Sequence, residues 1–180
     1  MHPQLADLST QLNAVTARAL DMARPHDDAA FHKRPPSGGW SAAECMAHLN
    51  LTTVEFLPRL DKLFATARLG FADTQRYRRG LIGAMLAWSL EPPARMRFRT
   101  APRFVPNSTG RKEEILAEWE RLQRELDAQL QRASGLHLNE LRVRSPFNSR
   151  VTYNVYAAFC ILAAHERRHV WQAERALAGA

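Results

Sequence analysis

Two histidines near the carboxyl end of the chain, His165 and His169, have the spacing of residues that bind a common ion. Four residues apart in a helical segment, two side chains lie on one face with Cβ atoms roughly 5–6 Å apart. The pair continues the apolar stripe of its segment, and burying two neutral imidazoles with nothing to bind would be costly. The pair therefore indicates a divalent metal ion, although satisfied core histidines or a surface pair have the same spacing.

A third histidine, His48, lies beside Leu49 on the apolar stripe of a different segment, so it can face the first two. Three histidines from two helices would bind a metal ion and leave a coordination position for water or substrate. Such a set suits zinc, nickel or iron(II). Taken alone, His48 is more simply interpreted as a core or boundary histidine, and only the combination of three favours a metal site.

The sequence from His165 to His169 also reads H-E-x-x-H, the metalloprotease motif in which the glutamate is the general base. Only eleven residues follow His169, and Arg175 occupies the position of a metzincin's third histidine. This spacing argues against a protease. Glu166 stays a candidate base for a metal-bound water, or else a partner in a surface or interhelical salt bridge. Gln172 is a candidate substrate contact or a plain inward polar residue.

Four long amphipathic segments must position these residues. Apolar residues recur every three or four positions in residues 4–23, 41–63, 109–134 and 151–178. This pattern predicts an all-α fold, a four-helix bundle with a long connection between the second and third helices, as a single domain over residues 1–180.

Local signals refine this outline. Ser41 and Glu44 form a predicted capping box at the start of the second helix. Glu44 has an alternative role, which is to orient the imidazole of His48 one turn later. Pro58 predicts a kink or a restart in that helix. Within the connection, residues 81–90 fit a short helix, and residues 95–104 alternate enough for an extended arm.

The positive charge is concentrated in the middle of the chain. The net charge is +7, and residues 66–112 hold nine Arg and one Lys against Asp73 and Glu91, a surplus of eight. Within this segment, Arg76, Arg78 and Arg79 could bind an anionic cofactor, or they could belong to a solvated basic surface. No nucleic-acid-binding motif accompanies the charge, which argues against a nucleic-acid partner.

The composition places the chain among ordinary globular proteins. Hydrophobic residues make up 46% of it, and the longest apolar run is about half a membrane span. With no signal peptide visible at the start of the chain, a cytoplasmic location is expected. Cys45 and Cys160 are too few for a disulfide scaffold, and we expect buried free thiols.

Two stretches resemble the DinB/YfiT-like metalloprotein superfamily. Gly39–Leu49 matches its W-S-x-x-E-x-x-x-H-L motif, and His165–Gln172 matches its H-x-x-R-H-x-x-Q motif. The four-helix outline and the separation of the motifs also suit the family. The resemblance implies a bundle in up-down-down-up order and a metal site with His48, His165 and His169 as ligands.

The resemblance also implies a chemistry. Members that are understood resemble metal-dependent thiol S-transferases, which join a low-molecular-weight thiol such as bacillithiol to an electrophile. A hydrolase that uses metal-bound water and a non-catalytic metal-binding protein are the alternatives. Separately from the resemblance, we hypothesise that Arg76, Arg78 and Arg79 of the basic middle segment bind the carboxylate of such a thiol. A homodimer is conceivable, because that segment has few assigned packing partners.

Overall fold

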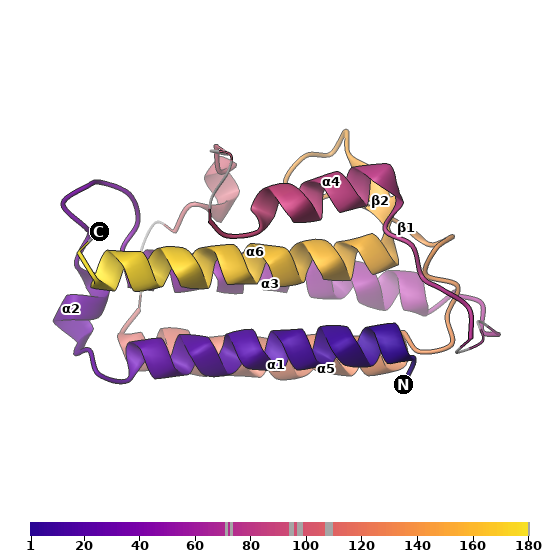
Figure 1. Cartoon of the computed structure of the whole chain (residues 1–180), viewed down its shortest axis with the longest axis horizontal. Coiled ribbons are helices and arrows are strands. Elements are labelled where there is room, and N and C mark those ends of the chain that lie inside the picture. Colours follow the sequence, from indigo (N-terminus) through magenta and orange to yellow (C-terminus); the bar gives the residue numbers. More distant parts are fainter. Residues whose placement is uncertain (71, 73, 94–95, 97–98, 107–109, 180) are drawn as a thin grey trace.

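The computed structural model describes residues 1–70, 72, 74–93, 96, 99–106 and 110–179 (Figure 1). Its elements are, in order, α1 (Pro3–Ala23), α2 (Asp28–His32), α3 (Ala42–Phe64), α4 (Gly80–Leu90), the 3₁₀ turn η1 (Pro102–Phe104), α5 (Lys112–Arg132), β1 (Arg142–Arg144), β2 (Thr152–Asn154) and α6 (Val155–Leu177). The protein is therefore mostly helical, as predicted, with one small two-stranded sheet.

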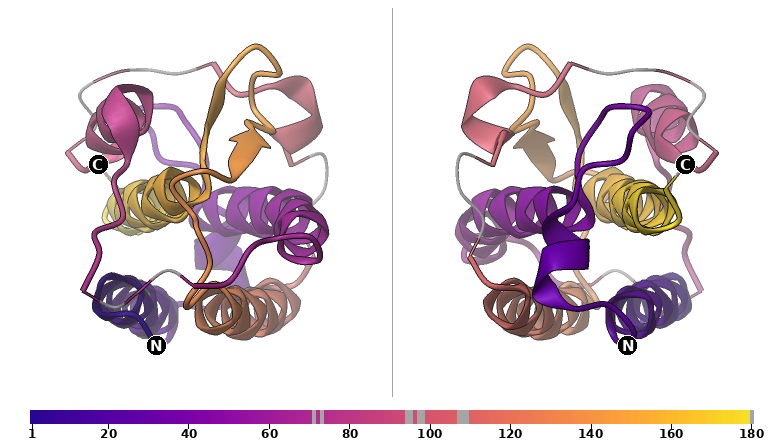
Figure 2. Two further views of the ribbon diagram at one scale, coloured as in Figure 1. Left: turned by 90° about the vertical axis from the view of Figure 1, so that its right-hand side faces the viewer. Right: turned by 90° about the vertical axis from the view of Figure 1, so that its left-hand side faces the viewer.

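The four long helices form a ring in which each contacts two others. α1 and α3 each pack against both α5 and α6, and Figure 2 shows the four seen end-on. Arg18 of α1 pairs with Glu174 near the ends of α1 and α6, so these helices are parallel. The Asn50 side-chain amide of α3 donates to the Ile115 carbonyl of α5. Both residues lie in the first half of their helices, so α3 and α5 are also parallel. The two pairs run in opposite directions (Figure 1), in agreement with the expected up-down-down-up order.

The capping box at the start of α3 is present. The Glu44 amide donates to the Ser41 hydroxyl over 3.2 Å, and the Ser41 amide donates to the Glu44 carboxylate over 2.9 Å. Arg34 donates to the same carboxylate, and this hydrogen bond lowers the pKa of Glu44. Helix α3 continues through Pro58 as one element, so the helix does not restart there. The capping box therefore fixes where the helix that carries His48 begins.

Helix α6 begins later than the sequence pattern predicts. The pattern predicts a helix over residues 152–154, but they form β2, which pairs antiparallel with β1 through Val143 and Tyr153. The β-branched and aromatic side chains of Thr152 and Tyr153 suit a strand. The helix then starts at Val155, where the Asn154 side chain accepts a hydrogen bond from the Ala157 amide as an N-cap.

Two other predicted boundaries lie partly outside the described residues. Helix α5 begins at Lys112, whereas the predicted start, Thr109, is not among the described residues. The extended arm over residues 95–104 includes residues 95, 97 and 98, which are also outside that part of the chain. The end of the arm is not extended, because residues 102–104 form the η1 turn. In this turn the Phe104 amide donates a hydrogen bond to the Ala101 carbonyl.

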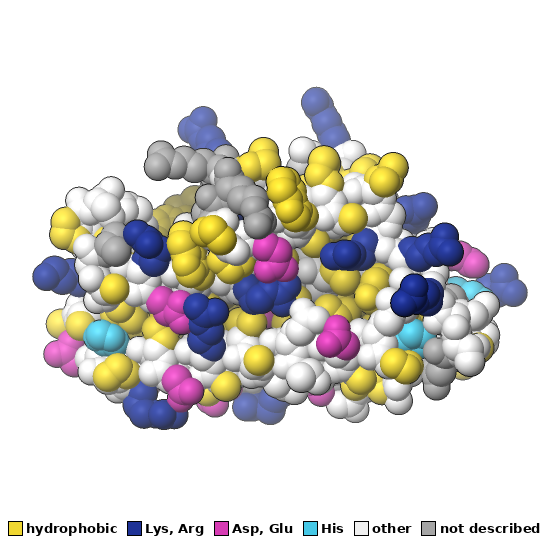
Figure 3. Space-filling view, in the orientation of Figure 1, with side chains coloured by type: hydrophobic (Ala, Val, Ile, Leu, Met, Phe, Trp, Pro, Cys, Tyr) yellow, Lys and Arg dark blue, Asp and Glu magenta, His cyan; other side chains and the backbone are white. Residues whose placement is uncertain are grey.

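The predicted short helix is α4, and it lies with η1 and the strand pair over the layer of α3 and α6 (Figure 2). α4 packs closely on α6, since a Cβ added at Gly83 would lie 2.4 Å from the Cβ of Ala157. Its outer face carries the exposed side chains of Leu81, Met85 and Trp88, and Figure 3 shows apolar side chains along this edge. Dimerisation through this segment stays a prediction.

No helix within the described residues has both the length and the apolar character needed to cross a membrane.

Replacing Ser41 with alanine should lower the free energy of unfolding by about 1 kcal/mol, because the variant loses the side-chain acceptor for the Glu44 amide. Urea denaturation at neutral pH measures this change. Ser149→Ala is the matched control, since Ser149 is exposed in a turn. An unchanged free energy in Ser41→Ala, or an equal loss in the control, would contradict this role of the cap.

Candidate metal centre

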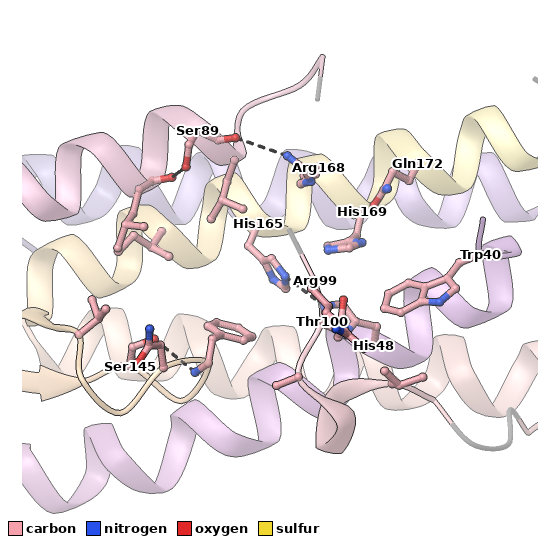
Figure 4. A pocket seen from close by; sticks show the side chains of 18 of the residues that line it. Trp40, His48, Ser89, Arg99, Thr100, Ser145, His165, Arg168, His169 and Gln172 are labelled. Carbon is pink, nitrogen blue, oxygen red and sulfur yellow. Dashed lines mark hydrogen bonds between the residues drawn. The ribbon is translucent and has the colours of Figure 1, made fainter. Parts of the chain in front are cut away.

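His48 of α3 and His165 and His169 of α6 converge in the interior, each less than a tenth exposed. One candidate ligand atom from each lies within 4.8 Å of the others. The Nε2 atoms of His48 and His165 are 3.1 Å apart, and Figure 4 shows their rings pointing toward each other. Nitrogens bound to one tetrahedral zinc ion are about 3.3 Å apart, so this spacing fits a shared ion.

The hydrogen bond of His48 leaves one of its nitrogens free for an ion. Its Nδ1 lies 2.7 Å from the Phe104 carbonyl oxygen of η1, and a carbonyl only accepts, so Nδ1 carries the proton. The lone pair of Nε2 then faces His165. Metal-binding histidines usually donate their second ring nitrogen to a carbonyl or carboxylate in this way.

The other two histidines each keep an unsatisfied nitrogen. The Nδ1 atoms of His165 and His169 are buried and have no hydrogen-bond partner within the described part of the chain. Buried polar atoms without partners are rare in native proteins and often mark a missing ion or water. The three imidazole donors and the 3.1 Å approach of the His48 and His165 Nε2 atoms fit a divalent metal ion, and an ion bound to those atoms would leave the His165 Nδ1 as an N–H group.

Burial keeps all three imidazoles in the form that binds metals. It is the largest cause that lowers the pKa of His48. The pKa values of His165 and His169 are lowered further by the other histidines of the cluster and by the positive charge of Arg168. The rings are consequently neutral at pH 7, and neutral imidazole is the ligating form.

Aromatic side chains hold the rings in place. Trp40 stacks on His169 with ring centroids 5.9 Å apart and lies 4.9 Å from the His48 ring. Phe147 contacts His165 with a centroid distance of 5.4 Å. These contacts restrict the orientation of each imidazole and cover part of the cluster from water.

A pocket of about 730 Å³ opens onto the three histidines, a size typical of small-molecule sites. Leu86, Phe147 and Ile161 contribute to its apolar wall. Two arginines, Arg99 and Arg168, bring positive charge, and its described lining contains no aspartate or glutamate. The lining comes from α3, α4, α6, the strand pair and the segment around η1, so the connection and the strands form the outer side of the pocket (Figure 4).

Residues 11–173 match the sequence model of the DinB superfamily. The chain belongs to this family. The match includes all three histidines and the elements that carry them. No curated protein and no solved structure matches the chain in the corresponding searches. Membership of the DinB superfamily and the three-histidine cluster together indicate metal binding, and they leave the reaction open.

Arg168 is the most buried cation in the described lining of the pocket, and the sequence shows it only as the arginine of the H-x-x-R-H-x-x-Q motif, with no role assigned. It is only 6% exposed, and its guanidinium donates to the Met96 carbonyl over 2.6 Å and to the Ser89 carbonyl over 3.4 Å. Its spacing was a usable signal, because residue 168 follows His165 by three positions and shares its helix face.

The weaker site candidates are placed differently by the structure. Gln172 lines the pocket, and its buried Oε1 has no hydrogen-bond partner among the described residues. Glu166 is not in the lining. It is 1% exposed and accepts a hydrogen bond from the Gln123 amide of α5 over 3.0 Å. Glu166 forms no salt bridge with the residues that the structure describes, so the predicted salt bridge is absent there. Burial raises the pKa of Glu166 to about 8.

The three arginines of the basic segment lie elsewhere. Arg76, Arg78 and Arg79 do not line the histidine pocket but a second one, formed with α1, α4 and α6. They are therefore not placed to bind a thiol at the histidines, because the residues preceding α4 lie on the other side of that helix. The cations that do face the histidine pocket are Arg99 and Arg168.

The remaining predictions for the site are resolved by single contacts. Glu44 accepts hydrogen bonds from Ser41 and Arg34, so it caps the helix. His48 is oriented by the Phe104 carbonyl and not by Glu44. Both cysteines are free and buried, as expected. Burial raises the pKa of Cys45 to about 12 and that of Cys160 to about 11, which makes both thiols poor nucleophiles.

The unfolding free energy of the Glu166→Gln variant should rise relative to that of the parent chain as the pH rises. The Glu166 pKa is about 8 in the folded state against an ordinary value of 4.5, so folding takes up a proton between these values. Stability of the parent therefore falls with rising pH in this window, by up to about 1.4 kcal/mol per unit, and the glutamine variant lacks this term.

The measurement is urea unfolding of both chains, treated with EDTA, between pH 5.5 and 8.5. The difference in unfolding free energy should grow up to about pH 8 and then level off. A difference that stays constant over this range would mean that Glu166 is ionised in the folded protein.

Proposed function

We propose that this DinB-superfamily protein is a metal-dependent thiol S-transferase. His48, His165 and His169 would hold one divalent ion, either zinc, nickel or iron(II). The observation that carries the proposal is the cluster of three neutral, buried imidazoles at the base of a pocket large enough for a small molecule. When bound, such an ion supplies the Lewis acidity that lowers the pKa of a thiol or a water.

The pocket residues suit a small anionic thiol such as bacillithiol. Arg168 is held toward the pocket by backbone carbonyls, and Arg99 adds a second positive charge, so a carboxylate on the thiol would find a partner. The free Oε1 of Gln172 can accept a hydrogen bond from the same molecule. The apolar wall around Phe147 would receive the electrophile.

Transfer of the thiol needs no nucleophile from the protein. A sulfur–carbon bond forms, the leaving group departs with its electron pair, and the proton of the thiol passes to solvent. This fits the two cysteines, which are buried and have raised pKa values.

Hydrolysis by an activated water is the second candidate reaction for the same pocket. It commonly uses a carboxylate as general base. The described lining contains no carboxylate, and Glu166 is turned to Gln123 of α5. This favours thiol transfer, which can proceed without such a base.

Protein purified without a histidine tag should contain about one divalent ion per chain. His48→Ala and His165→Ala should each reduce the bound metal at least tenfold, because each removes a ligand from a set of three. His26→Ala, outside the cluster, is the control and should retain the metal. Elemental analysis measures the content, and circular dichroism checks that the variants are folded. Full metal content in both cluster variants would contradict the site.

Metal-loaded protein should accelerate the consumption of a low-molecular-weight thiol by monochlorobimane. Arg168→Gln should raise the KM for a carboxylate-bearing thiol by about 10- to 100-fold, the loss of a charged hydrogen bond, with a smaller effect on kcat. Arg124→Gln removes an exposed arginine of α5 and serves as the control. Metal-loaded protein that consumes none of several thiols would refute transferase activity and leave a hydrolase or a non-catalytic protein.

A further inference from the structure

The second pocket, of about 650 Å³, shares no lining residue with the histidine pocket. Its lining comes from α1, from residues 76–79, and from α4 and α6. The two pockets contact different faces of α4, since Ala87 and Glu91 line the second, whereas Leu86 and Ser89 line the first. The two cavities are therefore separate sites.

Unneutralised positive charge distinguishes this second pocket. Arg76, Arg78 and Arg79 form no ion pair with any residue that the structure describes, although all three line the cavity. Glu91 is paired with Arg167, and Asp7, which accepts a hydrogen bond from Gln11, offsets only one further charge, so four arginines against two carboxylates leave the described lining positive. Dark-blue side chains are visible on this face, where α1, α4 and α6 meet (Figure 3).

The backbone that carries these arginines is fixed by side chains from three parts of the fold. Gln4 accepts from the Tyr77 amide over 2.7 Å and donates to the Tyr77 carbonyl over 3.1 Å. Asn139 accepts from the amide of residue 78 and donates to the carbonyl of residue 76. Asn154 donates to the carbonyl of residue 78 over 2.7 Å. The segment has no regular secondary structure, yet its arginines project from a preorganised backbone.

Helix α4 adds to the positive potential at this place. It begins directly after Arg79, and no side chain caps its first amides. The amino end of an eleven-residue helix carries partial positive charge, which favours a nearby anion. The hydrogen-bonding side chains of Gln11 and Tyr156 also line the pocket.

We propose that this pocket binds the phosphate or carboxylate group of a small anionic molecule, independently of the metal centre. The guanidinium group of arginine matches both oxyanions through paired N–H donors. A pocket of this volume suits a small molecule more than an extended macromolecule.

The test is isothermal titration calorimetry of the full chain, treated with EDTA so that no anion binds a metal. The probes are inorganic phosphate, pyrophosphate and citrate at low ionic strength. The triple variant Arg76→Gln, Arg78→Gln and Arg79→Gln should weaken binding of the preferred probe at least tenfold. The matched control, Arg124→Gln, Arg144→Gln and Arg150→Gln, removes the same charge from exposed arginines elsewhere and should change the affinity less than twofold.

Preference for pyrophosphate over citrate assigns the site to phosphates, and the reverse preference assigns it to carboxylates. His165→Ala should not alter anion binding, so this proposal and the metal site can fail separately. Equal weakening by the two triple variants, or no binding of any of the three probes, would overturn it. Thermal denaturation verifies that the arginine variants, all of exposed side chains, and the buried His165→Ala variant remain folded.

Discussion

The close approach of His48 on α3 to His165 and His169 on α6 is the constraint on which the rest of the structure depends. Burying three imidazoles withdraws six ring nitrogens from water, and each unsatisfied one is costly. The Phe104 carbonyl accepts a hydrogen bond from Nδ1 of His48 and so fixes the tautomer of this residue, and the Nε2 atoms of His48 and His165 lie within hydrogen-bond distance of each other. Three neutral imidazole donors this close together form a ligand set for a divalent ion, and binding of that ion would help to offset the cost of burying them.

The order of the helices brings the three histidines together, and the connections between the helices line the pocket that opens onto them. With α3 and α6 adjacent in the ring, residues far apart in the sequence meet halfway along the bundle. The long connection and the strand pair do not complete the bundle but form the outer part of the pocket. α4 also separates two cavities: Arg168 contacts its end from the histidine pocket, and its neighbour Arg167 binds Glu91 in the other.

Much of this could be predicted from the sequence, because helical periodicity and caps are local signals. The long helices and the Ser41 cap follow from spacing alone, whereas the grouping of His48 with His165 and His169 depended also on the resemblance to the DinB motifs. The strand at Thr152–Asn154 could not be separated from the helix, since Val151 and Val155 on either side of it have the four-residue spacing of a helical stripe. The partners of Glu166 and of the basic segment depend on tertiary packing. Helix spacing does not say that Glu166 faces Gln123 or that Arg76 lines another cavity.

The central claim is that these three histidines share one ion in an arrangement already present in the folded chain. X-ray absorption spectroscopy of protein reconstituted with one equivalent of zinc tests it most directly. We predict three imidazole nitrogens at about 2.0–2.1 Å and one further light atom, with no sulfur in the first shell. Fewer than three imidazoles, or a sulfur ligand from Cys45 or Cys160, would contradict the account.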